Sequence, residues 1–197
     1  MTNSNQEQIA NAIAYLNSHP CPVLLVPTET VYGLVCPWDN AEARDRIYEM
    51  KQRDAAKQLA LFLPCPEAAQ HFVSVIPETA KRIAARFMPG PVTLVIPDDN
   101  GGTFGYRVPD HPLLLPLLRE YGKPLASTSA NRSGEPAALQ VEEALKSLAF
   151  PPDLILDGGV IPAGSKASTV IRVFADNTWE ILRPGPVTEE MLRDLLV

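Results

Sequence analysis

Cysteine is scarce in this chain of 197 residues, which contains only Cys21, Cys36 and Cys65. Their number is odd and no two of them stand in a C-x-x-C spacing, so the sequence favours neither a disulfide framework nor a zinc site. Histidine is equally rare, and the three copies do not show the spacing of metal ligands. We expect the histidines at the surface or at caps, and no metal bound by protein ligands.

Positive charge and long apolar runs are also lacking. The formal net charge of -6 and the pI of about 5.1 argue against a broad surface for nucleic acid, although a local basic cleft stays open. No apolar run approaches the roughly 20 residues that cross a bilayer. The first six residues lack the basic and apolar regions of a signal peptide. We therefore expect a cytoplasmic protein without a membrane segment.

The chain does have the composition for one sizeable core, because 46% of its residues are hydrophobic. We expect a single domain over residues 1–197. A capping box at Ser4 and apolar periodicity predict helices at 4–19, 40–51, 66–74, 77–87, 112–121, 140–148 and 188–196. Short apolar runs predict strands at 23–26, 59–63, 92–96, 106–108, 123–127, 154–156, 169–173 and 179–182. This mixture predicts an α/β fold with a mixed, twisted sheet flanked by helices.

Familiar nucleotide-binding and hydrolase motifs are absent. The stretch 159–166 imitates a P-loop, but Ser165 stands where the lysine is needed and Pro162 fits poorly. Neither a G-x-G-x-x-G fingerprint nor a G-x-S-x-G elbow is found. Three polar segments remain, namely Pro27–Leu34, Lys51–Arg53 and Ser127–Gly134. Their cations, hydroxyls and amide suit the holding of phosphates and carboxylates better than covalent attack.

Lys51 and Arg53 stand at the end of an expected helix, where cations complement the helix dipole. From position alone this structural role stays open beside a binding role. The strand expected from residue 59 follows at once, and strand ends are where sites form in α/β sheets. Arginine offers a planar fork for a carboxylate or phosphate, and lysine a compact charge. We therefore expect both side chains to face a cleft.

The segment Ser127–Gly134 follows an expected strand and carries four hydroxyls and an amide within seven positions. A capped turn would explain part of this pattern, because Ser and Asn are favoured in turns. Hydroxyls and main-chain N–H groups at a strand end can also cradle an anion. Arg107 lies on an expected strand and Arg183 at the end of another, and a surface ion pair is the default explanation for both. Ser168 starts a strand after a loop rich in glycine and serine.

Together these segments resemble the YrdC/TsaC family of threonylcarbamoyl-AMP synthases, in the single-domain form. The resemblance runs in register from about residue 8 to residue 185. The matching stretches are Pro27–Leu34, Lys51–Arg53, Pro89–Thr93, Arg107–Pro112, Ser127–Gly134, Ser168–Val170 and Leu182–Gly185.

The resemblance implies a YrdC-like α/β fold, with a twisted, mixed, mostly parallel sheet around a large positively charged cavity. It implies a nucleotidyltransferase that makes L-threonylcarbamoyl-AMP and pyrophosphate from L-threonine, bicarbonate and ATP, with Mg²⁺ carried by the ATP. The product would pass to the tRNA threonylcarbamoyl transfer machinery for N6-threonylcarbamoyladenosine (t6A37) modification. Direct contact with tRNA or double-stranded RNA is a further expectation.

The resemblance also assigns roles residue by residue. The residues expected around the phosphate and carbamate are Lys51, Arg53, Ser129 and Asn131. Those expected to hold threonine are Thr30, Arg107, Ser127 and Ser168. Those expected to contact the nucleotide are Arg53, Lys57, Thr103, Ser129 and Arg183.

The sequence departs from the family pattern at three positions. Asp54 replaces a common proline, Gln58 precedes Leu59, and Phe62 stands where many members have a histidine near threonine. Two alternatives therefore stay open. One is a paralogue that adenylates a different carbamate, and the other is a module that binds RNA or nucleotide without this chemistry.

Overall fold

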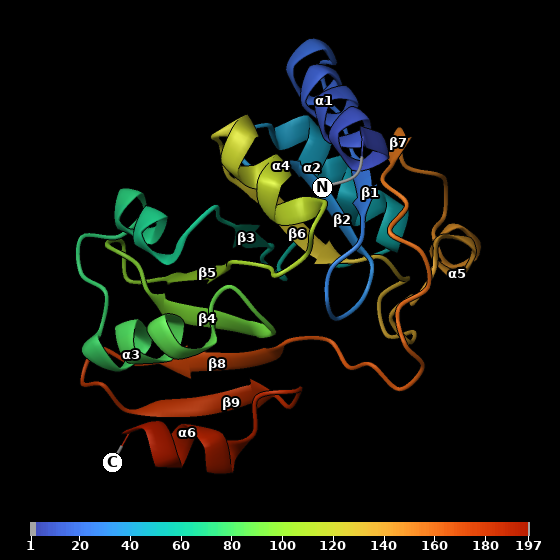
Figure 1. Cartoon of the computed structure of the whole chain (residues 1–197). Coiled ribbons are helices and arrows are strands. Elements are labelled where there is room, and N and C mark those ends of the chain that lie inside the picture. Colours follow the sequence, from blue (N-terminus) through green and yellow to red (C-terminus); the bar gives the residue numbers. More distant parts are fainter. Residues whose placement is uncertain (1–2, 197) are drawn as a thin grey trace.

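The computed structural model describes residues 3–196 and shows one mixed sheet with helices on both faces (Figure 1). The helices are α1 (Asn3–Ser18), α2 (Ala41–Lys51), α3 (Glu78–Phe87), α4 (Leu114–Tyr121), α5 (Val141–Ser147), α6 (Glu189–Leu196) and the 3₁₀ helix η1 (Pro66–His71). The strands are β1 (Leu24–Val26), β2 (Gly33–Pro37), β3 (Ala60–Phe62), β4 (Val92–Pro97), β5 (Thr103–Arg107), β6 (Leu125–Ser129), β7 (Leu154–Ile155), β8 (Thr169–Val173) and β9 (Trp179–Arg183). None of the described helices is long and apolar enough to cross a membrane.

The strands of residues 3–196 form one sheet in the order β7-β1-β2-β6-β3-β5-β4-β8-β9. The pairs β7–β1, β3–β5 and β4–β8 are parallel, and the other five pairs are antiparallel. The mixed sheet expected from the sequence is confirmed. Parallel pairs are fewer than expected, because short connections make β1–β2, β4–β5 and β8–β9 antiparallel neighbours and because β6 runs antiparallel to both β2 and β3.

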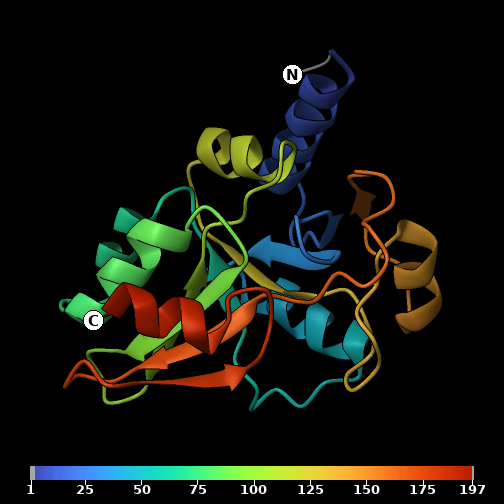
Figure 2. The same ribbon diagram turned by 60° about the horizontal axis from the view of Figure 1, so that its bottom comes forward.

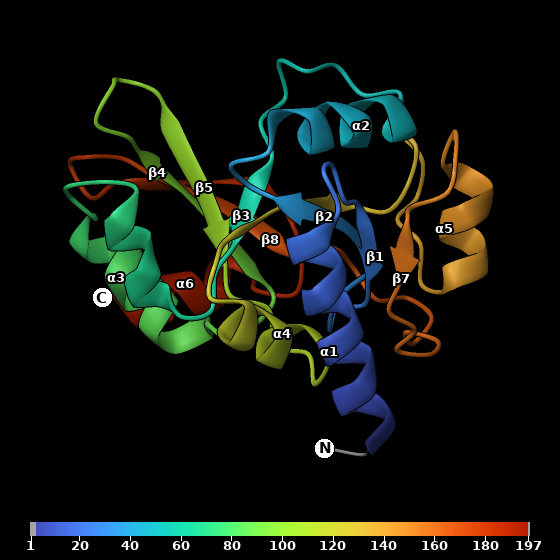
Figure 3. The same cartoon turned by 90° about the horizontal axis from the view of Figure 1, so that it is seen from above.

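Two apolar cores hold the helices on the sheet. On one face of β1, β2 and β6 lie α1 and α4, while α2 lies against the other face (Figure 3). The smaller core packs α1 and α4, through side chains such as Ile9, Leu16, Leu114 and Leu118, on that first face. The larger core joins α2, α3, α5 and α6 to the opposite face of the sheet. Within this layer α3 and α6 lie side by side (Figure 2).

Most predicted elements are found within two or three residues of their expected bounds. Three details differ. Ser4 lies inside α1 instead of capping it, and the helix expected at 66–74 is the short 3₁₀ helix η1. Strand β2 was not expected, because its ends are glycine and proline.

Candidate active site

A pocket opens on the sheet face that carries α1 and α4, beyond the part that these helices cover. Along β6, Leu125 packs in the core beneath α4, whereas Ser127 and Ser129 project from the same face and line the pocket. The pocket encloses about 270 Å³, or about 970 Å³ with its open mouth included. Its lining comes from the β1–β2 loop, the end of α2 and strands β3, β4, β5, β6, β8 and β9.

Three arginines, Arg53, Arg107 and Arg183, line this pocket, and none of its lining residues is an aspartate or glutamate. Burial lowers the pKa of the Arg53 guanidinium. Burial also lowers the pKa of Arg183, and the charges of Arg107 and Arg53 lower it further. The guanidinium groups therefore converge closely enough to repel one another, so the pocket is suited to a ligand with several negative charges.

The cationic pair Lys51 and Arg53 is placed by the way α2 begins and ends. The helix begins at Asn40, whose side chain accepts a hydrogen bond from the Ala43 N–H at 2.9 Å. It ends at Gln52 in a left-handed conformation with φ 48°, and the Gln52 and Arg53 N–H groups bond back into the last turn. This ending directs Lys51 inward beneath the loop after β6 and leaves Arg53 on the pocket wall.

Lys51 is 1% exposed and does not line the pocket. Its amino group donates to the main-chain oxygens of Ser129 and Asn131, and its Nζ lies 3.5 Å from Asn131 Oδ1. Burial, together with the nearby Arg53 charge, lowers the pKa of Lys51 to about 8. The expectation that Lys51 faces the cleft is therefore corrected, because its donors are taken up by carbonyl oxygens below the pocket floor.

The loop after β6 has a firmly bonded backbone. The Ala130 N–H donates to the Tyr32 carbonyl at 2.8 Å, and the Ser133 N–H donates to the Lys51 carbonyl at 2.9 Å. The amide nitrogen of Asn131 donates to the carbonyl oxygens of Arg132 and Glu135 at 2.9 and 2.7 Å. Asn131 thus shapes the loop from below, while Ser129 contributes to the pocket lining. The structure brings the four expected phosphate and carbamate residues together in this region.

Arg53 spans the mouth of the pocket between two segments. Its Nη1 donates to Thr128 Oγ1 at 3.3 Å, and its Nη2 donates to the carbonyl oxygens of Lys57 and Gln58 at 3.2 and 3.1 Å. Its Nε is buried and has no partner among the described residues. These contacts fix the guanidinium between the α2–β3 connection and β6, with its charge on the pocket wall.

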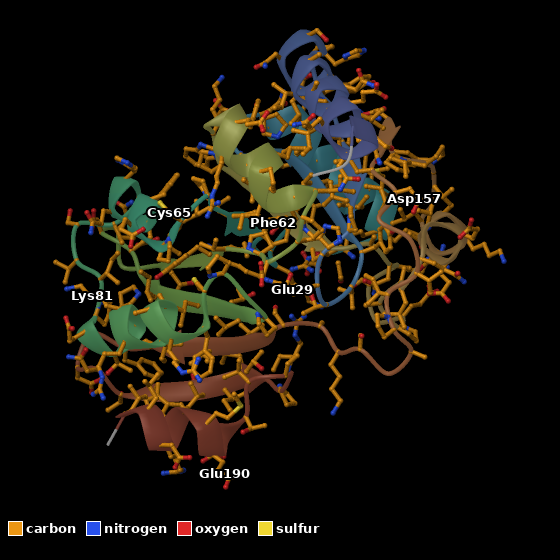
Figure 4. The ribbon with its side chains drawn as sticks, in the orientation of Figure 1. Glu29, Phe62, Cys65, Lys81, Asp157 and Glu190 are labelled. Atoms are coloured by element: carbon orange, nitrogen blue, oxygen red, sulfur yellow. The ribbon has the colours of Figure 1, made fainter. Side chains whose placement is uncertain are left out.

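Arg107 ends β5 and is held on its outer side by three groups. Its Nε donates to the Gly90 carbonyl at 3.2 Å and its Nη2 to Thr30 Oγ1 at 3.0 Å. The same Nη2 lies 2.8 Å from Glu29 Oε1, on the β1–β2 loop labelled in Figure 4. Thr30 therefore contacts the guanidinium of Arg107 from outside the pocket lining. The expectation that Thr30 contacts threonine is corrected, because its side chain does not line the pocket.

On the opposite wall, Arg183 and Ser168 form a second bonded group. Arg183 donates from Nε and Nη2 to the Ser168 carbonyl at 3.2 and 2.9 Å. The Ser168 hydroxyl lies 2.8 Å from Thr93 Oγ1 and also accepts from Arg183 Nη2 at 3.2 Å. Ser127, across the pocket on β6, donates to the Ala60 carbonyl at 3.0 Å. Arg183, Ser168 and Ser127 all line the pocket as expected.

Two expected nucleotide residues do not line the pocket. Lys57 is exposed on the α2–β3 connection, where its main-chain oxygen serves Arg53 and Tyr48. Thr103 begins β5 and projects from the same face as Gly105 and Arg107, which do line the pocket. Both residues therefore lie outside the pocket lining. Thr103 lies on the same face of the sheet as the pocket.

With this geometry in view, the chain can be compared with known proteins. A model of the Sua5, YciO and YrdC proteins, described as "Telomere recombination", matches residues 22–185. The chain belongs to the Sua5/YciO/YrdC family. The expected family resemblance is thereby confirmed.

Named relatives of this Sua5/YciO/YrdC chain are threonylcarbamoyl-AMP synthases. That of Bacillus subtilis is 35% identical over 98% of this chain, and that of Chromohalobacter salexigens is 32% identical over 83%. The chain spans 58% of the first relative and 91% of the second. The crystal structure of Pyrococcus abyssi Sua5 complexed with L-threonine superimposes with a TM-score of 0.85 at 31% identity. That match covers 95% of this chain and 57% of the Sua5 chain.

The positions at which the sequence departs from the Sua5/YciO/YrdC pattern fall on or near the pocket. Gln58 and Phe62 line it, and the Phe62 ring centroid lies 5.8 Å from the Arg107 guanidinium carbon. Figure 4 labels Phe62 near the centre of the sheet. Asp54 is exposed and its Oδ1 accepts from the Ala56 N–H at 2.9 Å, so it caps a turn outside the lining.

A magnesium ion would have few protein ligands here. The lining offers hydroxyls and arginines but no carboxylate, and the described residues contain no cluster of three or more metal-ligating side chains. Mg²⁺ prefers oxygen ligands and keeps several waters. The donor set therefore fits an ion carried by the phosphates of a nucleotide and not a resident protein-bound ion.

Sequence reasoning missed four polar residues of the site region. Thr28, Thr93 and Thr128 line the pocket, and Glu29 contacts Arg107 from behind. The signal for Thr28 was present, because a threonine after proline favours a local turn, and its Oγ1 accepts from the N–H groups of residues 30 and 31. Thr93 alternates with the core residues Val92 and Leu94 along β4, and this period shows that it occupies the face away from that core.

Proposed function

We propose that this protein is an L-threonylcarbamoyladenylate synthase, a nucleotidyltransferase that uses L-threonine, bicarbonate and ATP. The observation that carries the proposal is the pocket of three convergent arginines and a row of hydroxyls, without any carboxylate in its lining. The names of the relatives and the threonine complex of a similar structure support the same reading.

The charges of the pocket match the charges of the reactants. ATP and the carbamate of threonine are both anions, and they must approach each other for the reaction. Arg53 and Arg183 stand on opposite walls and would bind phosphate oxygens, while Arg107 would bind the threonine carboxylate. The cations offset the repulsion between the reactants, and catalysis follows from positioning and charge neutralisation.

The reaction consists of two steps. The threonine amino group and bicarbonate combine to form N-carboxythreonine, with release of water and a proton. A carbamate oxygen then attacks the α-phosphorus of ATP, the bond from this phosphorus to the bridging oxygen breaks, and pyrophosphate leaves with that oxygen. Mg²⁺ on the phosphates supplies further charge neutralisation. The hydroxyls of Ser127 and Ser129 lie on β6, on the same side of the pocket as Arg53, and would orient the anion bound there.

A direct test is the detection of threonylcarbamoyl-AMP by mass spectrometry after incubation with ATP, Mg²⁺, bicarbonate and L-threonine. Release of pyrophosphate should require both bicarbonate and threonine. Each other amino acid is tested in parallel, because Gln58 and Phe62 in the pocket wall replace family residues. Adenylate formation with a different amino acid would assign the chain to a paralogue, and no ATP consumption with any amino acid would refute the proposal.

Three further expectations belong to the same proposal and stay predictions. They are transfer of the product to the tRNA threonylcarbamoyl machinery, direct contact with tRNA or double-stranded RNA, and a cytoplasmic location. RNA affinity that survives substitution of Arg53 and Arg183, in a protein that does not consume ATP, would favour the binding module over the enzyme.

A further inference from the structure

Glu29 is the carboxylate that contacts one of the three pocket arginines among the described residues. It lies on the β1–β2 loop, where Figure 4 labels it. Its Oε1 is 2.8 Å from Arg107 Nη2. The side chain is 21% exposed, yet both carboxylate oxygens are shielded from solvent. Neither oxygen accepts a well-aligned hydrogen bond from a described residue. The contact is therefore an ion pair in which a buried carboxylate depends on Arg107 for its compensation.

The same contact restricts Arg107. Its Nε and Nη2 are taken up by Gly90, Thr30 and Glu29, all on the side away from the pocket lining. Its Nη1 makes no hydrogen bond with the described part of the chain, although the residue lines the pocket. One end of the guanidinium is thus fixed, and the two N–H groups of Nη1 are left to a ligand.

Electrostatic repulsion explains why such a restraint is needed. Arg107 shares the pocket with Arg53 and Arg183, and the lining supplies no negative charge. An unrestrained guanidinium would move away from the other two cations when the pocket is empty. Glu29 offsets this repulsion from behind, where it does not occupy the space of the ligand.

We propose that Glu29 is a positioning residue for amino-acid binding, which holds Arg107 in the orientation that receives the substrate carboxylate. The inference rests on the proposed function, since it takes threonine as the ligand of Arg107. Glu29 acts through Arg107 and makes no contact of its own with the substrate. The alternative, in which Glu29 binds the substrate amino group, is separated by the experiment below.

The test compares Glu29→Gln, Arg107→Gln and the double variant, with Glu180→Gln as a matched control. Glu180 is an exposed glutamate that lies 3.9 Å from Arg172, outside the pocket. Dissociation constants are measured for L-threonine, for threonine amide, which lacks the carboxylate, and for 3-hydroxybutyrate, which lacks the amino group. Thermal unfolding of each variant shows whether the fold is kept. Should Glu29→Gln fail to fold, Glu29→Asp replaces it, because it keeps the charge but shortens the reach.

Glu29→Gln should weaken the binding of threonine and of 3-hydroxybutyrate by on the order of tenfold, the size expected for one charge-assisted contact. The affinity for threonine amide should stay within about twofold, and the double variant should bind threonine no more weakly than Arg107→Gln, because the two residues act as one unit. Equal losses for all three ligands, or losses restricted to the two ligands with an amino group, would overturn the inference. Wild-type protein that does not bind threonine would refute the proposed function and this inference with it, whereas wild-type binding with an unchanged Glu29→Gln affinity refutes the inference alone.

Discussion

The amino group of Lys51 donates to the main-chain oxygen of Asn131, eighty residues farther along the chain. Through this contact and its bond to the Ser129 carbonyl, the last residue of α2 holds the loop that follows β6. Of the two cations in Lys51–Arg53, Lys51 thus bonds to the segment that follows β6, whereas Arg53 lines the pocket.

Replacing Lys51 by methionine should damage both stability and activity. The substitution removes the donors of two buried carbonyl oxygens, and each group left without a partner costs about 1–3 kcal/mol of unfolding free energy. Because Lys51 also bonds to the carbonyl of Ser129, whose side of the pocket it helps to hold, the rate of adenylate formation should fall on the order of 10²–10³-fold. Urea unfolding and a pyrophosphate-release assay check the two effects, and an undiminished rate would remove Lys51 from the site.

The lowered pKa of Lys51 gives a pH dependence with a definite sign. The folded protein releases this proton near pH 8, whereas the unfolded chain keeps it up to about pH 10.5. Between these values the unfolded state binds more protons, so the free energy of unfolding should rise with pH. Relative to Lys51→Met, wild-type protein should gain about 1–3 kcal/mol across this window in urea unfolding. Parallel pH curves for the two proteins would show that the amine does not titrate there.

Arg183 should act on the nucleotide and not on the amino acid. It lines the pocket from β9, whereas Arg172 on the neighbouring β8 is exposed and pairs with Glu180. Arg183→Gln should raise the KM for ATP by on the order of tenfold, since one charged contact to phosphate is lost, and leave the KM for threonine nearly unchanged. Arg172→Gln is the control and should change neither constant. A rise in the threonine KM alone would place Arg183 on the other substrate.

Phe62 should affect the amino acid through its ring. The Arg107 guanidinium lies 5.8 Å from the ring centroid, a cation–π contact with an expected strength of about 0.5–2 kcal/mol. Phe62→Leu keeps an apolar side chain but removes the ring, so the KM for threonine should rise several-fold while the KM for ATP stays constant. Steady-state kinetics with each substrate varied in turn measures both constants. Equal changes in the two would indicate a general loss of packing.

Thr169 begins β8 beside the pocket residue Ser168 and provides a test of stability. Its buried hydroxyl donates to the Val187 carbonyl at 2.8 Å and accepts from the Val187 N–H at 2.9 Å. Thr169→Val keeps the shape but leaves both main-chain groups without a partner, which should cost about 2–4 kcal/mol in urea unfolding. Thr178→Val removes a hydroxyl from an exposed turn and should cost less. Similar losses for both would mean that water compensates Val187.

The sequence predicted the elements that depend on local signals, such as the apolar stripe of α2 and the strands with apolar runs. The sequence did not predict the elements whose structure depends on tertiary contacts. Gly33 and Pro37 at the ends of β2 argue against a strand, yet Gly33 lies so close to β6 that an added Cβ would stand 3.1 Å from the Thr128 carbonyl. Pairing between two distant segments is what makes this segment a strand.

The same limit applies to the site. Motif order identified the three arginines of the pocket and the hydroxyls of Ser127, Ser129 and Ser168, but not the hydroxyls of Thr28, Thr93 and Thr128. It did not show that the Lys51 amine turns inward, since helix position alone does not reveal which acceptors lie beneath it. Motif order also did not identify Glu29. Its role depends on an ion pair with Arg107, which lies 78 residues farther along the chain at the end of β5.

The pocket wall ends at β9, the outermost strand of the sheet, which brings Arg183 to the site. Edge hairpins open more readily than central strands, so brief separation of β9 from β8 would release one cation of the pocket while the α1–α4 core stays closed. A polyphosphate that binds both Arg183 and Arg53 would therefore hold β9 in place on the sheet. It would slow amide hydrogen exchange in β9 more than in β1.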